Sequence, residues 1–219
     1  MSAVAVLLWG VAALLGTAAL AVAVNRMRSA TLLIYLSTLA ISAGLLLAGL
    51  AHLIGNAAGA PVLTLPLGLP WIGAHFRLDA LSSFFLVIIN LGGKMASLYG
   101  LGYGSHEQAP QRVLPFFPAF LAGMNLVLLA DDAFTFLLSW EFMSLASWAL
   151  VMAHHRHDDN RRAGYIYIVM ASFGTLSLLL AFGLLAGAGG NYAFEAMRAA
   201  EPSHFVAGAV LGLMLLGAG

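Results

Sequence analysis

Six long apolar segments constrain the fold of this chain more than any other feature of its sequence. A helix needs about 17–25 residues, at 1.5 Å rise per residue, to cross the hydrocarbon core of a bilayer. The segments run near Ala3 to Val24, Ala30 to Leu53, Leu78 to Tyr103, Leu114 to Ala130, Ala133 to Met152 and Ala163 to Ala188. The sequence therefore predicts an all-α integral membrane protein with six transmembrane helices.

The composition excludes several classes of function. Hydrophobic residues make up 62% of the 219 residues and charged residues 8%, and the mean hydropathy is +0.95. A net charge of zero gives no basic surface for nucleic acid. The chain has no cysteine, which excludes disulfides and cysteine-ligated zinc or iron–sulfur centres within it. No histidine pair at mid-membrane depth could ligate haem, so we expect no cofactor and no metal in this chain.

The chain divides into two regions. Residues 1–77 hold two helices and a long connection that is rich in proline and glycine, at Pro61, Pro66, Gly68 and Pro70. This punctuation predicts a short external hairpin. Residues 78–219 hold the other helices and a seventh apolar run, Phe205 to Gly219, which at about 15 residues is short for a span. We expect this run to be a truncated seventh helix.

The basic residues predict the orientation. Most of them fall in connections on one side of six alternating helices, at Arg26, Arg28, Arg112, Arg156, Arg161 and Arg162, whereas Arg77 and Arg198 fall on the other. Cytoplasmic loops carry the excess of lysine and arginine. The sequence therefore predicts an outside N-terminus.

Glu141 is the only ionisable residue of the fifth apolar segment. It lies about 12 Å along that helix, and a charge near the bilayer centre costs at least about 2.5 kcal/mol. A movable cation beside it would let the carboxylate take up and release protons, which is the chemistry of a proton relay. The alternative is a structural acid that hydrogen-bonds Ser144, one turn away. We favour the relay.

Other polar residues of the helices are weaker candidates for a proton path. Lys94, the only lysine, lies near the cytoplasmic end of the third segment, about 12 Å from Glu141 in depth. Its side chain either belongs to the path or extends to the headgroups, and we favour the second. Tyr165, Ser172 and Thr175 of the sixth segment could line a wet path, although hydroxyl residues in membrane helices more often serve packing.

The connection HHRHDDNRR places His154, His155 and His157 close together. A metal site would need a fourth ligand and an ordered scaffold, and neither is evident in the sequence. We favour a solvated loop that sets the orientation, with a proton-collecting surface as a weaker alternative.

Three stretches resemble one family of membrane proteins. They are LVLLADDAFTFLLSWEFMSLASWALV, the segment from LDALSSFF to SLYGLGY, and RRAGYIYIVMASFGTLSLLLAFGLL. They resemble the antiporter-like proton-translocating subunits of respiratory complex I, the Mrp antiporters and the membrane-bound hydrogenases. WEFMSLASWALV and YIYIVMASFGTL look most like the large membrane subunit of hydrogenase-4 and formate hydrogenlyase complexes. The first two helices match only in type.

The resemblance implies a larger inverted-repeat fold with discontinuous helices, of which this chain would be the N-terminal part. Glu141 would be the fifth-helix glutamate, which in the family pairs with a lysine on the seventh helix, whereas this chain has no lysine after Lys94. It implies a non-redox, proton-translocating subunit of a hydrogenase or NADH:quinone oxidoreductase type of complex. The alternative is a subunit of a secondary Mrp-type cation/proton antiporter.

The resemblance also implies partners and a location. We expect other membrane subunits, peripheral redox subunits that carry the metal centres, the lipid bilayer and protons as partners. We expect a multi-pass protein in the inner (cell) membrane of a bacterium or archaeon.

Overall fold

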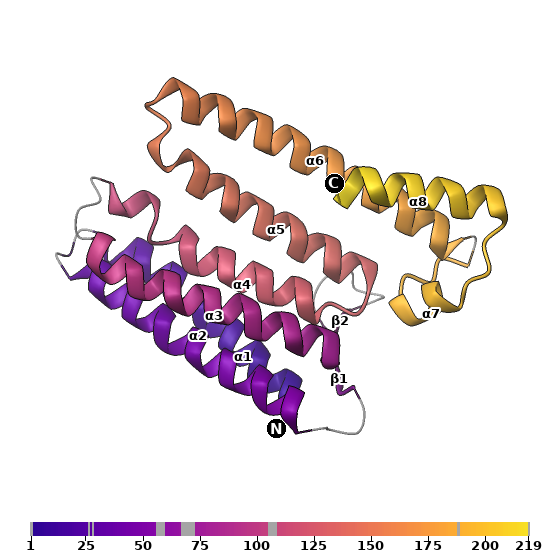
Figure 1. Cartoon of the computed structure of the whole chain (residues 1–219), viewed down its shortest axis with the longest axis horizontal. Helices are drawn as coiled ribbons and strands as arrows, with labels where there is room; N and C mark the ends of the chain where they lie inside the picture. Colours follow the sequence, from indigo (N-terminus) through magenta and orange to yellow (C-terminus); the bar gives the residue numbers. More distant parts are fainter. Residues whose placement is uncertain are drawn as a thin grey trace.

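The computed structural model is a bundle of long helices with a small hairpin at one end (Figure 1). It describes residues 2–25, 27, 29–55, 60–66, 73–104, 109–187 and 189–218. The elements are α1 (Ala3–Ala23), α2 (Ala30–Ile54), β1 (Val62–Leu65), β2 (Ala74–Arg77), α3 (Ala80–Tyr103), η2 (Pro110–Arg112), α4 (Phe116–Leu129), α5 (Ala133–Val151), η3 (Met152–His154), α6 (Asp158–Ala186), α7 (Phe194–Ala199) and α8 (His204–Ala218).

The six predicted transmembrane helices are confirmed. Within the described residues, six helical segments are long and apolar enough to cross a membrane, and they contain or overlap the six apolar segments. The fourth of them, Pro110–Leu129, joins η2 to α4. Some positions used in the predictions fall outside the described residues: the basic positions Arg26 and Arg28, the turn residues Gly68 and Pro70, and the ends predicted at Ala188 and Gly219.

The start predicted for the sixth helix is wrong by five residues. Hydropathy places it at Ala163, but α6 begins at Asp158 because the polar DDNRR stretch forms its first turns. Asp158 and Asp159 stabilise this N-terminus, where the helix dipole favours negative charge. Hydropathy marks the apolar part of a helix, and the helix itself continues beyond it. The short α7 was not predicted, because a single polar turn has no clear periodicity.

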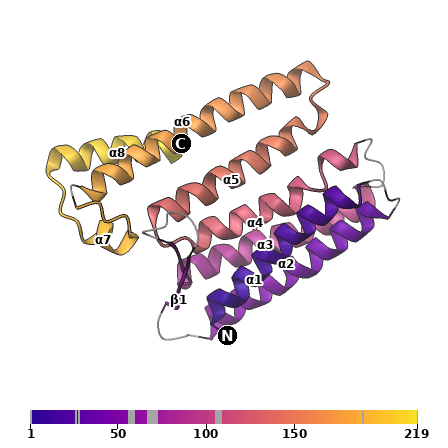
Figure 2. The ribbon, with the colours of Figure 1, turned by 180° about the vertical axis from the view of Figure 1, so that it is seen from behind.

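The helices are arranged in layers (Figures 1 and 2). α2 packs against α1 and α3, α4 packs against α1, α3 and α5, and α6 packs against α5 and α8. One end of the bundle carries the hairpin and α7, and the other carries the turn between α5 and α6. α4 therefore lies between α3 and α5.

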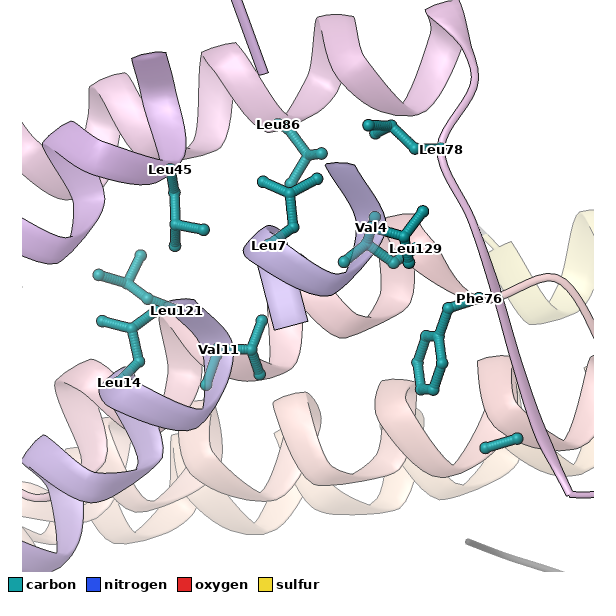
Figure 3. Packing of buried hydrophobic residues seen from close by; sticks show 12 residues of the cluster. Val4, Leu7, Val11, Leu14, Leu45, Phe76, Leu78, Leu86, Leu121 and Leu129 are labelled. Atoms are coloured by element: carbon teal, nitrogen blue, oxygen red, sulfur yellow. The ribbon is translucent and has the colours of Figure 1, made fainter. Parts of the chain in front are cut away.

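An apolar core joins the first four helices to the hairpin (Figure 3). Leu7, Leu14 and Leu86 are fully buried in it, and Phe76 of β2 closes one end. The membrane supplies no hydrophobic drive between helices, so close packing has to hold them together. At Gly123 in α4 a Cβ would lie 2.8 Å from the Met143 Cα, and glycine is what allows α5 to approach this closely.

The predicted short hairpin is confirmed, and it is tied to the helices. β1 pairs antiparallel with β2, with Val62 opposite Arg77. The short segment between α4 and α5, residues 130–132, lies beside β2, and Asp131 N–H donates to the His75 carbonyl (2.9 Å). On its other side, Ala133 N–H donates to the Tyr192 carbonyl (3.0 Å). We call residues 130–132 the junction segment.

Candidate functional site

Glu141 is half-buried on α5, facing α6. The Thr175 hydroxyl of α6 donates to its Oε2 atom at 2.8 Å. The same hydroxyl lies 3.1 Å from the Ala171 carbonyl, one turn back in α6. A hydroxyl has one proton but also accepts. Thr175 can thus donate to an ionised Glu141, or turn toward Ala171 and accept from a protonated one.

The other hydroxyl candidates are not part of this contact. Ser144 is buried on α5, but the hydroxyl that reaches the carboxylate comes from Thr175. Tyr165 and Ser172 lie on the exposed surface of α6, Tyr165 with 70% of its area accessible. Of the candidates on α6, the structure brings Thr175 to Glu141.

Lys94 lies on a different layer of the bundle. It is half-buried on α3, which α4 separates from α5 (Figure 1). In the part of the chain that the structure describes, no lysine or arginine forms an ion pair with Glu141.

Asp132 is a buried carboxylate that was not among the predicted site residues. It is 1% exposed and caps the start of α5. Its oxygens accept from Thr135 N–H (2.8 Å), the Thr135 hydroxyl (2.6 Å) and His75 N–H (3.0 Å), and His75 Nδ1 lies 3.3 Å away. An aspartate three residues before a threonine at a helix start is a capping signal that could have identified it.

Two further acids surround Arg77 beside the junction segment. Arg77 Nε lies 3.1 Å from Asp131 Oδ1, and Arg77 Nη2 lies 3.5 Å from Asp79 Oδ2. Burial raises the pKa of Asp131, although Arg77 and Arg198 oppose the rise. Burial also acts to raise the pKa of Asp79, but the Ser82 hydrogen bonds and Arg77 outweigh it and hold the pKa below its usual range. Asp79 therefore stabilises the fold at neutral pH and loses this contribution as the pH falls through its lowered pKa.

An asparagine pair joins α3 to α4 inside the bundle. Asn90 and Asn125 are both fully buried. The Asn90 amide nitrogen donates to Asn125 Oδ1 (2.7 Å) and to the Leu86 carbonyl (2.9 Å), and the Asn125 nitrogen donates to the Leu121 carbonyl (2.7 Å). The pair satisfies its own polar groups, which favours a structural role. It was not predicted, because neutral amides do not stand out in a hydropathy profile.

The three clustered histidines lie at the turn between α5 and α6. His154, His155 and His157 are exposed. Arg112, which precedes α4, donates to the Ala153 carbonyl (3.3 Å) and lies 3.5 Å from His155 Nδ1. Among the residues that the structure describes, no group of three or more histidine, aspartate or glutamate side chains is arranged to hold a metal ion. The solvated-loop interpretation stays a prediction.

Comparison with known proteins gives a family match for the C-terminal part. Residues 130–219 match the family model described as "NADH:quinone oxidoreductase/Mrp antiporter, TM". Hydrogenase-4 component B of Escherichia coli is 36% identical over 146 residues, which cover 65% of this chain and 21% of that protein. NADH-quinone oxidoreductase subunit L of Escherichia coli is 29% identical over 150 residues, 67% of this chain and 24% of that one.

A solved structure has the same fold. The Mrp complex from Dietzia sp. DQ12-45-1b contains a chain that matches 97% of this one with a TM-score of 0.76 and 21% identity, over 23% of its own length. The chain thus spans about a quarter of the length of the proteins that it matches. Residues 130–219, which match the family model, include the junction segment, Glu141 and Thr175.

Proposed function

We propose that this chain is an antiporter-like membrane subunit that translocates protons through Glu141. The proposal starts from the match of residues 130–219 to the NADH:quinone oxidoreductase/Mrp antiporter transmembrane family and from the similarity of the chain to hydrogenase-4 component B and NADH-quinone oxidoreductase subunit L. The proposed complex is of the hydrogenase-4, formate hydrogenlyase or NADH:quinone oxidoreductase type. Its partners would be other membrane subunits and peripheral redox subunits with the metal centres. Its place would be the cell membrane of a bacterium or archaeon.

The contact between Glu141 and Thr175 is the observation that carries the proposal. A half-buried carboxylate in a membrane helix would bind and release a proton only if a neighbour can accommodate both of its states. Thr175 meets that requirement because its hydroxyl has a second acceptor, the Ala171 carbonyl, within reach. Proton uptake by Glu141 would then need only a rotation of one hydroxyl.

We infer that a cation for Glu141 would approach from the side of α6 on which α8 lies. The described end of α8 comes close to α6 there, since a Cβ on Gly174 would lie 2.9 Å from the Gly217 carbonyl. Gly174 immediately precedes Thr175 in α6, so the two helices meet at the depth of the candidate site. A lysine supplied near this crossing would favour ionised Glu141 when it approaches and protonated Glu141 when it withdraws.

The second candidate function is a secondary cation/proton antiporter of the Mrp type. The similarity to the chain of the Mrp complex supports a shared fold and does not by itself support a shared function. The two functions differ in their driving force, since the first needs electron transfer and the second a cation gradient. A sodium gradient that drives proton movement in proteoliposomes without any electron donor would favour the antiporter.

The test of Glu141 uses the complete protein within its complex. Glu141→Gln keeps the shape and can still accept from Thr175, but it cannot ionise. We expect normal assembly and loss of proton translocation, measured in proteoliposomes per electron transferred. Thr175→Val should slow proton translocation. Ser144→Ala should lower the free energy of unfolding by about 0.6 kcal/mol and change proton translocation little. Normal pumping by an assembled Glu141→Gln complex would contradict the proposal.

A further inference from the structure

A basic pocket lies at the end of the bundle opposite the hairpin. Its volume is about 240 Å³, and its polar lining comes from Gln111, Arg112, His154, Arg156 and His157. No acidic side chain lines it among the described residues. The nearest acid of this turn in sequence, Asp158, is paired with Arg161 at 3.0 Å. The described lining of the pocket therefore contains two arginines, Arg112 and Arg156, and no carboxylate.

An apolar groove runs along the bundle between α1, α4 and α5. Its volume is about 560 Å³, and its lining includes Leu15 and Val22 of α1, Phe116 of α4, and Leu145 and Trp148 of α5. The groove is open to the side of the bundle, where the membrane would lie.

The pocket and the groove are adjacent where α4 begins and α5 ends. Ala149 of α5 lines the groove, and Ala153 and Arg156, four and seven residues later and beyond the end of α5, line the pocket. Arg112 of the pocket precedes Phe116 of the groove by four residues, and its guanidinium donates to the Ala153 carbonyl at 3.3 Å. A molecule with an acidic head and a long apolar tail would fit this arrangement.

We propose that the pocket and groove together bind an anionic phospholipid, with its phosphate between Arg112 and Arg156 and one acyl chain along the groove. Arginine binds phosphate through paired N–H groups, and basic pockets between membrane helices bind acidic headgroups. A helix of another protein could cover the groove but would leave the charge of the pocket unmatched. The charge therefore favours a lipid.

The test exploits Trp148, which lines the groove. In a Trp9→Phe, Trp71→Phe, Trp140→Phe background, its fluorescence reports acyl chains that occupy the site. The chain is placed in phosphatidylcholine vesicles with increasing fractions of either brominated phosphatidylglycerol or brominated phosphatidylcholine. We expect the glycerol lipid to quench Trp148 at a severalfold lower fraction. Native mass spectrometry of the unsubstituted chain should show one retained phosphatidylglycerol.

Matched variants separate the head site from the groove. Arg156→Gln should weaken the preference for phosphatidylglycerol about fivefold, whereas Arg162→Gln, near the start of α6 and outside the pocket, should leave it unchanged. Ala149→Phe, which fills the groove, should reduce quenching by both lipids, whereas Ala163→Phe on the exposed surface of α6 should not.

Three results would overturn the proposal. Equal quenching by the two lipids would show that the pocket does not select charge. Displacement of the brominated phosphatidylglycerol by millimolar inorganic phosphate would show a general anion site. A Trp148 that neither lipid quenches would show that no acyl chain occupies the groove.

Discussion

At the scale of single residues, α5 carries two carboxylates with opposite environments. Asp132 at its start is held by several donors from Thr135 and His75. Glu141, nine residues on, has the hydroxyl of Thr175 as its contact. A carboxylate surrounded by fixed donors is suited to hold a structure. A carboxylate with a single rotatable partner, such as Glu141, is the one for which we propose proton binding and release.

Asp132→Asn should destabilise the fold. The amide nitrogen would replace one acceptor oxygen and face a donor from Thr135 or His75, and hydrogen bonds to charged groups contribute about 1.5–3 kcal/mol. We expect the free energy of unfolding to fall by about 2 kcal/mol, measured by detergent titration. Glu201→Gln, at an exposed position, is the control and should change it by less than about 0.5 kcal/mol. An unchanged stability in Asp132→Asn would show that the cap is dispensable.

At the scale of elements, the sequence predicts which segments are helices better than it predicts which faces meet. Apolar length identified the six spans, and proline and glycine identified the hairpin. Thr175 was a candidate by its type, but its contact with Glu141 depends on the rotation of α6 against α5. The pattern of residues along a membrane helix does not encode that rotation, because its lipid-facing and protein-facing sides are both apolar. The contact of Asp132 with His75 could not be predicted for a related reason, since the two residues are 57 positions apart in sequence, although its capping of α5 is a local signal.

The Asn90–Asn125 pair makes a prediction about the α3–α4 contact. Asn90→Leu or Asn125→Leu alone leaves the other amide buried with a donor or acceptor that has no hydrogen-bond partner. Each single variant should therefore lower the free energy of unfolding by about 1–2 kcal/mol. The double variant removes both amides and should cost less than the sum of the two. Detergent titration of all three variants measures the coupling. Additive losses would show that the two amides do not act as a pair.

At the scale of the whole molecule, the two ends of the bundle differ in charge and in secondary structure. The end with the hairpin holds Arg77 among Asp79 and Asp131, whereas the other holds Arg112, Arg156, Arg161 and Arg162 with Asp158 and Asp159. The basic end is predicted to be cytoplasmic.

Single cysteines test this orientation, because the chain has none of its own. Cysteines at Ser29 and Asp159, both exposed at the basic end, should resist an impermeant thiol reagent in intact cells. One at Thr64, exposed on β1 of the hairpin, should react. All three should react after the membrane is permeabilised. Labelling of Ser29→Cys and protection of Thr64→Cys would place the N-terminus in the cytoplasm.

The junction segment also sets the depth and the rotation of Glu141. Because residues 130–132 are bonded to β2 on one side and to Ala193 and Phe194 on the other, the first turn of α5 is held in place along the membrane normal. Counting from Asp132, each residue adds 1.5 Å of depth and about 100° of rotation. Deleting one residue between Asp132 and Glu141 would therefore turn the carboxylate away from Thr175 while hardly changing its depth. The segment between the hairpin and Glu141 should therefore tolerate substitutions but not insertions or deletions.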